Sequence, residues 1–125
     1  MDTTLTLLIV DDIFINRLLI KEIVSSLSAN IIEAQNGKDA IDILMKQEVD
    51  IVLMDIEMPI MNGLETTRFI RKEFPSPKKF IPIIALTAHN PITFFNDYKD
   101  VGFNQLMTKP YSSKKLLSII NEVLV

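Results

Sequence analysis

The chain has 125 residues, which is a usual size for one domain and enough for a single hydrophobic core, so we expect residues 1–125 to form one domain. Hydrophobic residues make up 48% of the chain and charged residues 23%, a balance that excludes a disordered or a fibrous protein. The net charge of −3 argues against binding to nucleic acid, and the absence of cysteine excludes disulfides, thiolate metal sites and cysteine nucleophiles.

Five short apolar runs predict β-strands. They occupy residues 5–10, 30–34, 51–54, 83–86 and 105–108. The third and fourth runs are apolar at every position, which is typical of strands that are covered on both faces. We therefore expect these two strands to lie in the middle of a sheet.

Amphipathic stretches between and after the strands predict five helices. They occupy residues 15–27, 38–46, 63–74, 93–101 and 112–124. The predicted buried face of the second helix consists of Ala40, Ile41, Leu44 and Met45. Side-chain caps at helix starts are predicted at Asn62, Thr93 and Ser112, and a helix stop at Gly102.

The regular alternation of strand and helix predicts the fold class. Parallel strands need long crossovers, and here each crossover can hold a helix. We expect an α/β domain with a doubly wound, five-stranded parallel sheet. In such a sheet, ligands bind beyond the carboxyl ends of the strands.

Polar residues follow four of the five predicted strands. Asp11 and Asp12 follow the first strand, Asp55 the third, Thr87 the fourth and Lys109 the fifth. Because these strand ends meet at one edge of a parallel sheet, we expect three carboxylates, a hydroxyl and an ammonium to share one cleft. Any one of these residues alone would be unremarkable, since Asp is also common in turns and helix caps.

The residue types in this cleft suit phosphoryl transfer with a bound metal ion. Neighbouring carboxylates repel one another by about 1 kcal/mol per pair at 4 Å in water, and Mg²⁺, which prefers oxygen ligands, would relieve that repulsion. Asp55, at the tip of a central strand, is the predicted phosphoryl acceptor. Lys109 and Thr87 would contact the oxygens of the transferring group.

The same residues lie in motifs that resemble the response regulator receiver family over nearly the whole chain. The matching stretches are 8–12 (LIVDD), 52–59 (VLMDIEMP), 61–63 (MNG), 85–88 (ALTA) and 108–111 (TKPY). The resemblance implies the strand order 2-1-3-4-5 of a flavodoxin-like fold. The sequence departs from the family pattern at Leu106, where the family often carries Tyr or Phe.

The resemblance also implies a ligand set and partners. The metal ligands would be Asp11, Asp12, Asp55 and the backbone carbonyl of Glu57. The phosphoryl donor would be a histidine kinase or a histidine phosphotransfer protein of a two-component phosphorelay, and the chain would be a free-standing receiver or the receiver of a hybrid histidine kinase. A homodimer would form through the fourth helix, fifth strand and fifth helix.

We therefore expect a cytoplasmic signalling domain that accepts a phosphoryl group and loses it slowly, and that is not a multiple-turnover enzyme. No apolar run approaches the ~20 residues of a membrane-spanning helix. One alternative is a Mg²⁺-dependent phosphohydrolase that forms an aspartyl phosphate, although such enzymes of the haloacid dehalogenase type place the nucleophile after the first strand. Others are an interaction module that is never phosphorylated and a flavodoxin-like flavin binder, although no phosphate-binding loop follows the first strand.

Overall fold

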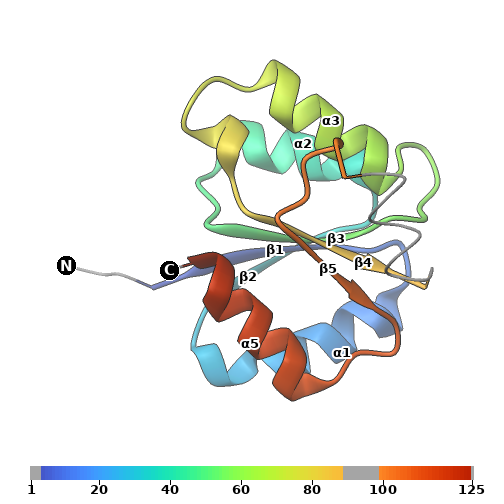
Figure 1. The fold of residues 1–125 in the computed structure, drawn as a ribbon, viewed down its shortest axis with the longest axis vertical. Helices are drawn as coiled ribbons and strands as arrows, with labels where there is room; N and C mark the ends of the chain where they lie inside the picture. Colours follow the sequence, from blue (N-terminus) through green and yellow to red (C-terminus); the bar gives the residue numbers. More distant parts are fainter. Residues whose placement is uncertain (1–3, 89–98, 125) are drawn as a thin grey trace.

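A computed structural model of the protein describes residues 4–88 and 99–124, and it contains one five-stranded parallel sheet (Figure 1). The strands are β1 (Thr6–Val10), β2 (Asn30–Ala34), β3 (Ile51–Asp55), β4 (Ile83–Thr87) and β5 (Gln105–Thr108). Their order is β2-β1-β3-β4-β5, and every neighbouring pair is parallel. The predicted fold class and strand order are confirmed, with strand ends within one residue of the prediction.

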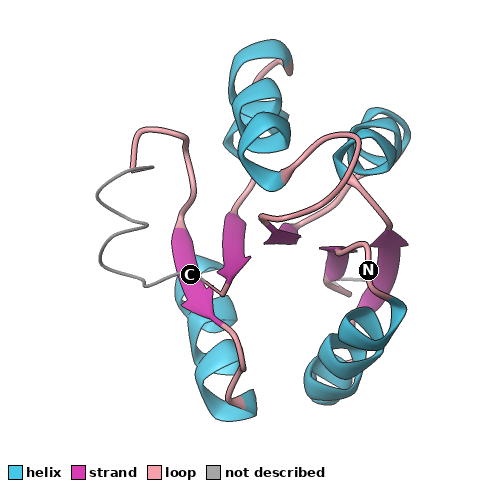
Figure 2. Cartoon of the chain, turned by 90° about the vertical axis from the view of Figure 1, so that its right-hand side faces the viewer, coloured by secondary structure: helices cyan, strands magenta, loops and turns pink. Residues whose placement is uncertain are grey.

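Helices connect and follow the strands (Figure 2). They are α1 (Phe14–Val24), α2 (Gly37–Lys46), α3 (Gly63–Glu73) and α5 (Ser113–Leu124), with short 3₁₀ turns at Ser25–Leu27 and Lys78–Phe80. Residues 93–98 of the predicted fourth helix, with its cap Thr93, lie outside the described residues. Within the described ranges, no helix is long and apolar enough to cross a membrane.

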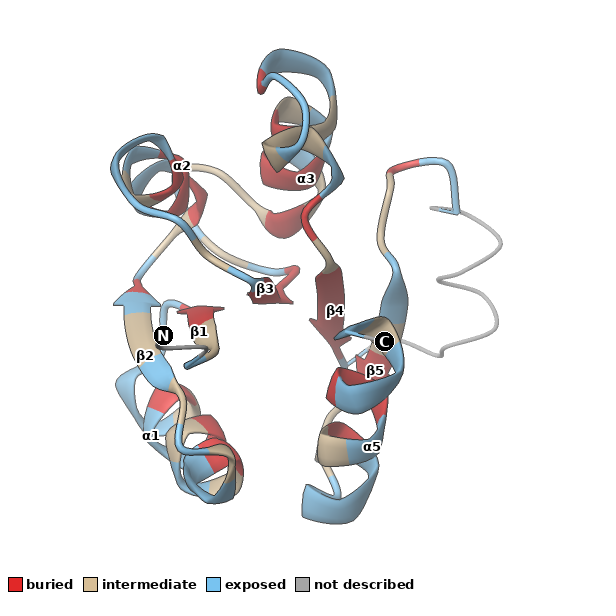
Figure 3. Ribbon diagram, turned by 90° about the vertical axis from the view of Figure 1, so that its left-hand side faces the viewer, coloured by how far each residue is buried: buried red, intermediate tan, exposed pale blue. Residues whose placement is uncertain are grey.

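The sheet has a hydrophobic core on each face. Helices α1 and α5 cover one face, and α2 and α3 cover the other (Figure 1). Alternate residues of β1 serve the two cores: Leu7 and Ile9 pack toward α1 and α5, Leu8 and Val10 toward α2 and α3. Strands β3 and β4 are buried along their whole length, as Figure 3 shows. Their predicted central position is confirmed. It places Asp55, the last residue of β3, at the carboxyl edge of the sheet between two neighbouring strands.

Two predicted caps are present. The Asn62 side chain accepts a hydrogen bond from the Glu65 backbone N–H (2.9 Å), and the Glu65 carboxylate accepts one from the Asn62 N–H (3.1 Å), which forms a capping box at the start of α3. Ser112 Oγ accepts a hydrogen bond from the Lys115 N–H (3.2 Å). Gly102 has a φ of 117°, which a glycine adopts without strain.

The predicted burial of Met45 is wrong, because this side chain is 62% exposed. The buried stripe of α2 runs instead along Gly37, Ala40, Ile41 and Leu44. Helix α3 approaches so closely at Gly37 that a Cβ there would lie 1.7 Å from Thr66 Oγ1. Because α3 contacts the helix at Gly37, the buried face of α2 is the face that carries Gly37, and Met45 lies outside that face.

Candidate functional site

The carboxyl edge of the sheet brings together the five residues that the sequence singled out. Asp11 and Asp12 follow β1, Asp55 and Thr87 end β3 and β4, and Lys109 follows β5. Asp11, Asp55 and Thr87 are buried, with 0%, 3% and 1% of their surface exposed, whereas Asp12 is exposed. The three aspartates each offer a carboxylate oxygen within 4.8 Å of the others. The predicted convergence of the carboxylates is therefore present.

Lys109 connects β5 with the carboxylates. Its Nζ lies 3.0 Å from Asp55 Oδ1 and 3.7 Å from Asp11 Oδ2. Its backbone N–H donates to the Thr87 carbonyl (2.8 Å), so the end of β5 is tied to the end of β4. The Lys109–Pro110 peptide bond is cis. The ammonium is thus placed to hold one oxygen of Asp55 by a charge-assisted hydrogen bond.

Burial dominates the electrostatics of Asp55. It raises the pKa of the Asp55 carboxyl, the Lys109 hydrogen bond opposes that shift, and the charges of Asp11 and Asp12 add to it. Burial, with the charges of Asp11 and Asp55, also raises the pKa of the Tyr111 phenol. An excess of negative charge therefore remains in the cleft after the Lys109 ammonium has been counted.

The start of α3 packs directly against the backbone of Asp55 and Ile56. The Gly63 N–H donates to the Ile56 carbonyl (2.9 Å), and a Cβ on Gly63 would lie 2.4 Å from the backbone oxygen of Asp55. Only glycine allows α3 to start this close to the end of β3. In the loop between them, Ile60 has a φ of 72°, which is a strained value for a β-branched residue. The sequence reasoning did not identify that strain.

The donor set fits a hard divalent cation. Asp11 Oδ1 accepts a hydrogen bond from the Ile13 N–H (2.9 Å) and one from Asn16 Nδ2 (3.5 Å). The other oxygen, Asp11 Oδ2, is buried and has no hydrogen-bond donor among the residues that the structure describes. A buried anionic oxygen without a donor is costly, and a metal ion would satisfy it. Residues Asp11, Asp12 and Asp55 can hold the ion, and ligation by the Glu57 carbonyl stays a prediction.

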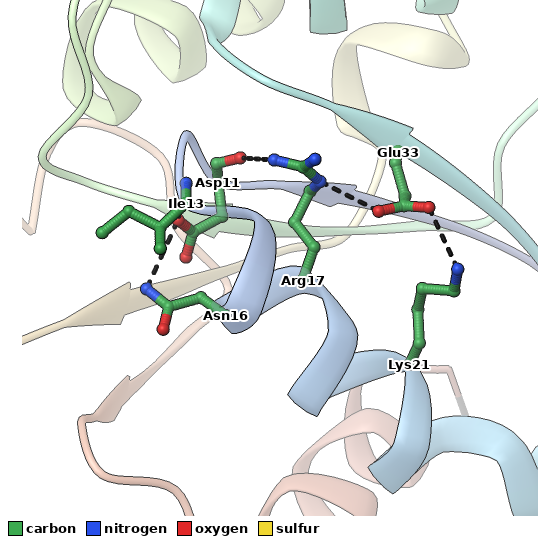
Figure 4. Close-up of polar contacts among 6 residues, drawn as sticks. All are labelled: Asp11, Ile13, Asn16, Arg17, Lys21 and Glu33. Carbon is green, nitrogen blue, oxygen red and sulfur yellow. Dashed lines mark hydrogen bonds and ion pairs between the residues drawn. The ribbon is translucent and has the colours of Figure 1, made fainter.

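The sequence reasoning missed the buried Arg17. Its side chain is 7% exposed and reaches both the Asp11 carbonyl and Glu33 (Figure 4). A signal was present, because Asn16 and Arg17 interrupt an apolar run over residues 13–20. An arginine is seldom buried unless its guanidinium is paired, and here Glu33 pairs with it.

An apolar surface borders the site on the α1 side. It consists of Ile13, Phe14, Ile15, Leu18 and Leu19, which are between 46% and 65% exposed. Large apolar side chains grouped on a surface in this way mark an interaction site more often than single ones do. We call these five residues the α1 apolar surface.

A protein-family model for the response regulator receiver domain matches residues 7–121. The chain belongs to this family. It is a two-component signalling receiver, and receiver domains are generally phosphoacceptors rather than multiple-turnover enzymes. Leu106, where the sequence departs from the expected family pattern, packs against the small cluster of Ile56 and Ala85.

The receiver is similar to both free-standing and kinase-linked relatives. It is 31% identical over 118 residues to the aerobic respiration control sensor protein ArcB of Escherichia coli K12, covering 94% of this chain but 15% of ArcB. It is 31% identical over 123 residues to two-component response regulator 24 of Arabidopsis thaliana, covering 98% of this chain and 86% of that protein. The chain thus matches a small part of one type of relative and most of the other.

A solved structure bears on the metal. The receiver domain of sensor histidine kinase PA1611 from Pseudomonas aeruginosa PAO1 is 28% identical, with a TM-score of 0.86 and 98% coverage of both chains. In that structure a magnesium ion is coordinated in the active-site cleft. The present chain has an acidic cluster that could bind a metal at its own carboxyl edge.

Proposed function

We propose that this receiver accepts a phosphoryl group on Asp55, with Mg²⁺ held by Asp11, Asp12, Asp55 and the Glu57 backbone carbonyl. The observation that carries the proposal is the position of Asp55: a buried carboxylate at the tip of a central strand, with one oxygen 3.0 Å from Lys109 Nζ and two further carboxylates within 4.8 Å. Lys109 contacts two of these three carboxylates, Asp11 and Asp55, and a divalent cation would balance the remaining negative charge.

In the proposed reaction, an Asp55 carboxylate oxygen attacks phosphorus. A new P–O bond forms while the bond between phosphorus and the donor nitrogen breaks, and its electron pair returns to the donor imidazole. The Lys109 ammonium and the Thr87 hydroxyl each contact an oxygen of the phosphoryl group as charge develops on it. Bound Mg²⁺ would neutralise part of that charge.

The raised pKa of Asp55 is compatible with this role. Burial and negative neighbours make the ionised carboxylate less stable than in water, so its conversion to an acyl phosphate forfeits less stabilisation than it would at an exposed site. Lys109 keeps the carboxylate oriented while opposing the shift. The cleft thus holds a nucleophile whose carboxylate form is poorly solvated.

The partner that we propose is a histidine kinase or a histidine phosphotransfer protein. A protein donor must cover the rim of the cleft to bring its histidine to Asp55, and the α1 apolar surface forms one side of that rim. Its burial would supply the apolar centre of a docking interface. A homodimer through α5, β5 and the fourth helix stays a prediction, because residues 93–98 lie outside the described residues.

The test is intact-protein mass after incubation with acetyl phosphate, with and without Mg²⁺. We expect one phosphoryl group on the wild type with Mg²⁺, and none without Mg²⁺ or on Asp55→Asn. Asp50→Asn is the matched control, because Asp50 is a carboxylate that directly precedes β3, at the end opposite Asp55. Phosphorylation that persists on Asp55→Asn would contradict the assignment, and repeated hydrolysis of phosphomonoesters would favour the phosphohydrolase instead.

A further inference from the structure

Arg17 makes two hydrogen bonds from a buried position at the start of α1. Its Nη1 donates to the Asp11 backbone carbonyl (2.8 Å), and its Nε donates to Glu33 Oε1 (2.9 Å). Lys21 contacts the other Glu33 oxygen at 3.1 Å, as Figure 4 shows. Phe14 covers the guanidinium at 5.7 Å. The guanidinium is therefore fixed through two of its nitrogens at once, which a lysine ammonium cannot reproduce.

These contacts tie the first acidic residue of the cleft to the edge strand. Glu33 lies on β2 opposite Ile9, and the Asp11 N–H donates to the Ala34 carbonyl (3.1 Å). The Asp11 residue is thus held at its N–H by β2 and at its carbonyl by Arg17. The Arg17 hydrogen bond is also the main reason that the pKa of Glu33 is lowered, so Glu33 stays ionised and keeps the guanidinium in place.

The carbonyl that Arg17 holds belongs to the peptide between Asp11 and Asp12. A hydrogen bond to this carbonyl restrains ψ of Asp11 and φ of Asp12, and with Asp11 held in place these two dihedral angles set where Asp12 and its carboxylate lie. Asp11 is wholly buried and its Oδ1 accepts from the Ile13 N–H, so a different backbone path from Asp11 to Asp12 would also move the Ile13 N–H away from that oxygen. The geometry of the acidic pair therefore depends on Arg17.

We propose that Arg17, supported by Glu33, is a positioning residue for the metal site. It does not touch the ion or the phosphoryl group, and it acts by holding the Asp11–Asp12 peptide in the orientation that places the Asp12 carboxylate beside that of Asp11. This inference rests on the proposed Mg²⁺ site. Groups that orient metal ligands typically contribute 10- to 100-fold to metal affinity.

The experiment compares Mg²⁺ affinity with stability in matched variants of the full chain. Arg17→Met keeps an apolar stem under Phe14 and removes both hydrogen bonds, and Glu33→Gln removes the supporting charge. Arg71→Met is the control, because Arg71 is a half-buried arginine that binds carbonyls at the opposite edge of the sheet. Calorimetric titration gives the Mg²⁺ dissociation constant, and urea unfolding without metal gives the stability.

We expect Arg17→Met to weaken Mg²⁺ binding about tenfold, the lower end of the scale for ligand-orienting partners. Glu33→Gln should weaken it less, because Arg17 can still donate to the Asp11 carbonyl. Arg71→Met should lose more stability than either and keep the wild-type dissociation constant. If Arg17→Met does not fold, Arg17→Lys and Glu33→Gln carry the test. Equal affinities of these variants and the wild type would overturn this inference alone, whereas a wild type that does not bind Mg²⁺ would overturn it together with the proposed function.

Discussion

The two edges of the sheet satisfy their polar groups in opposite ways. At the amino edge, Arg71 donates to the carbonyls of Gly102 (2.9 Å), Lys79 (2.8 Å) and Ile81 (2.7 Å) and to Asn104 Oδ1 (2.9 Å). At the carboxyl edge, two buried oxygens, Asp11 Oδ2 and the Tyr111 hydroxyl, have no hydrogen-bond partner among the described residues.

This difference separates a structural edge from a functional one. A polar group that the protein itself satisfies contributes to stability, whereas a buried charge that waits for a ligand costs stability until the ligand binds. Asp50, at the amino edge, accepts a hydrogen bond from the Thr6 N–H (2.8 Å), while Asp55, five residues later, has a raised pKa. The same residue type therefore stabilises one end of β3 and is expected to destabilise the other.

Of the substitutions that test this difference between the two edges, Arg71→Met should change the free energy of unfolding most. Arg71→Met should lower the free energy of unfolding by about 3 kcal/mol, because hydrogen bonds from a charged donor contribute about 1.5–3 kcal/mol and four acceptors lose their donor. Urea unfolding without metal measures the loss. Lys72→Met, at an exposed neighbouring position, is the control and should change stability by less than about 0.5 kcal/mol. A similar loss of stability in both variants would contradict the stabilising role of the Arg71 hydrogen bonds at the amino edge.

At the carboxyl edge, the change at Asp55 should have the opposite sign. Asp55→Asn should raise the stability of the metal-free protein by about 1 kcal/mol, because it removes repulsion between carboxylates at little steric cost. A lower melting temperature for this variant than for the wild type without Mg²⁺ would contradict the claim that carboxylate repulsion destabilises the carboxyl edge. Saturating Mg²⁺ should reverse the order, since a ligand at 100 times its dissociation constant stabilises the wild type by about 2.7 kcal/mol.

The pH dependence of that gain follows from the raised pKa. Asp55 binds its proton more tightly in the folded than in the unfolded state, so protonation stabilises the folded wild type below the unfolded pKa and this stabilisation is lost as the pH rises through the folded pKa. The advantage of Asp55→Asn should therefore be complete above the folded pKa of Asp55 and shrink as the pH falls toward the unfolded pKa. Melting curves from neutral to acidic pH measure it.

The smallest expected effect is at Tyr111, whose phenol packs beside the acidic cluster. Its raised pKa means that the folded state keeps the phenol proton longer than the unfolded state does. Wild-type stability should therefore fall as the pH rises above about 10, the ordinary pKa of tyrosine, relative to Tyr111→Phe. Below that pH, Tyr111→Phe should be as stable as the wild type or better by about 0.5 kcal/mol, because it removes an unsatisfied hydroxyl. Parallel curves across the whole range would show that the phenol titrates normally.

Much of the fold followed from local patterns. The apolar runs at 51–54 and 83–86 predicted two central strands, because strands covered on both faces must be apolar throughout. The Asn62 cap was predictable because its hydrogen-bond partner lies three residues away. The pattern failed at Met45, since the width of a buried stripe depends on how closely the next helix packs.

For this receiver, the sequence by itself determined which chemical groups reach the carboxyl edge, because each of them ends or follows a strand and parallel strands end at the same edge. The tertiary structure decided how those groups are satisfied. Arg17 meets Glu33 across 16 residues, Lys109 meets Asp55 across 54, and Arg71 meets Gly102 across 31. Periodicity is a property of near neighbours along the chain, whereas burial and hydrogen bonding over such separations exist only after the sheet has formed.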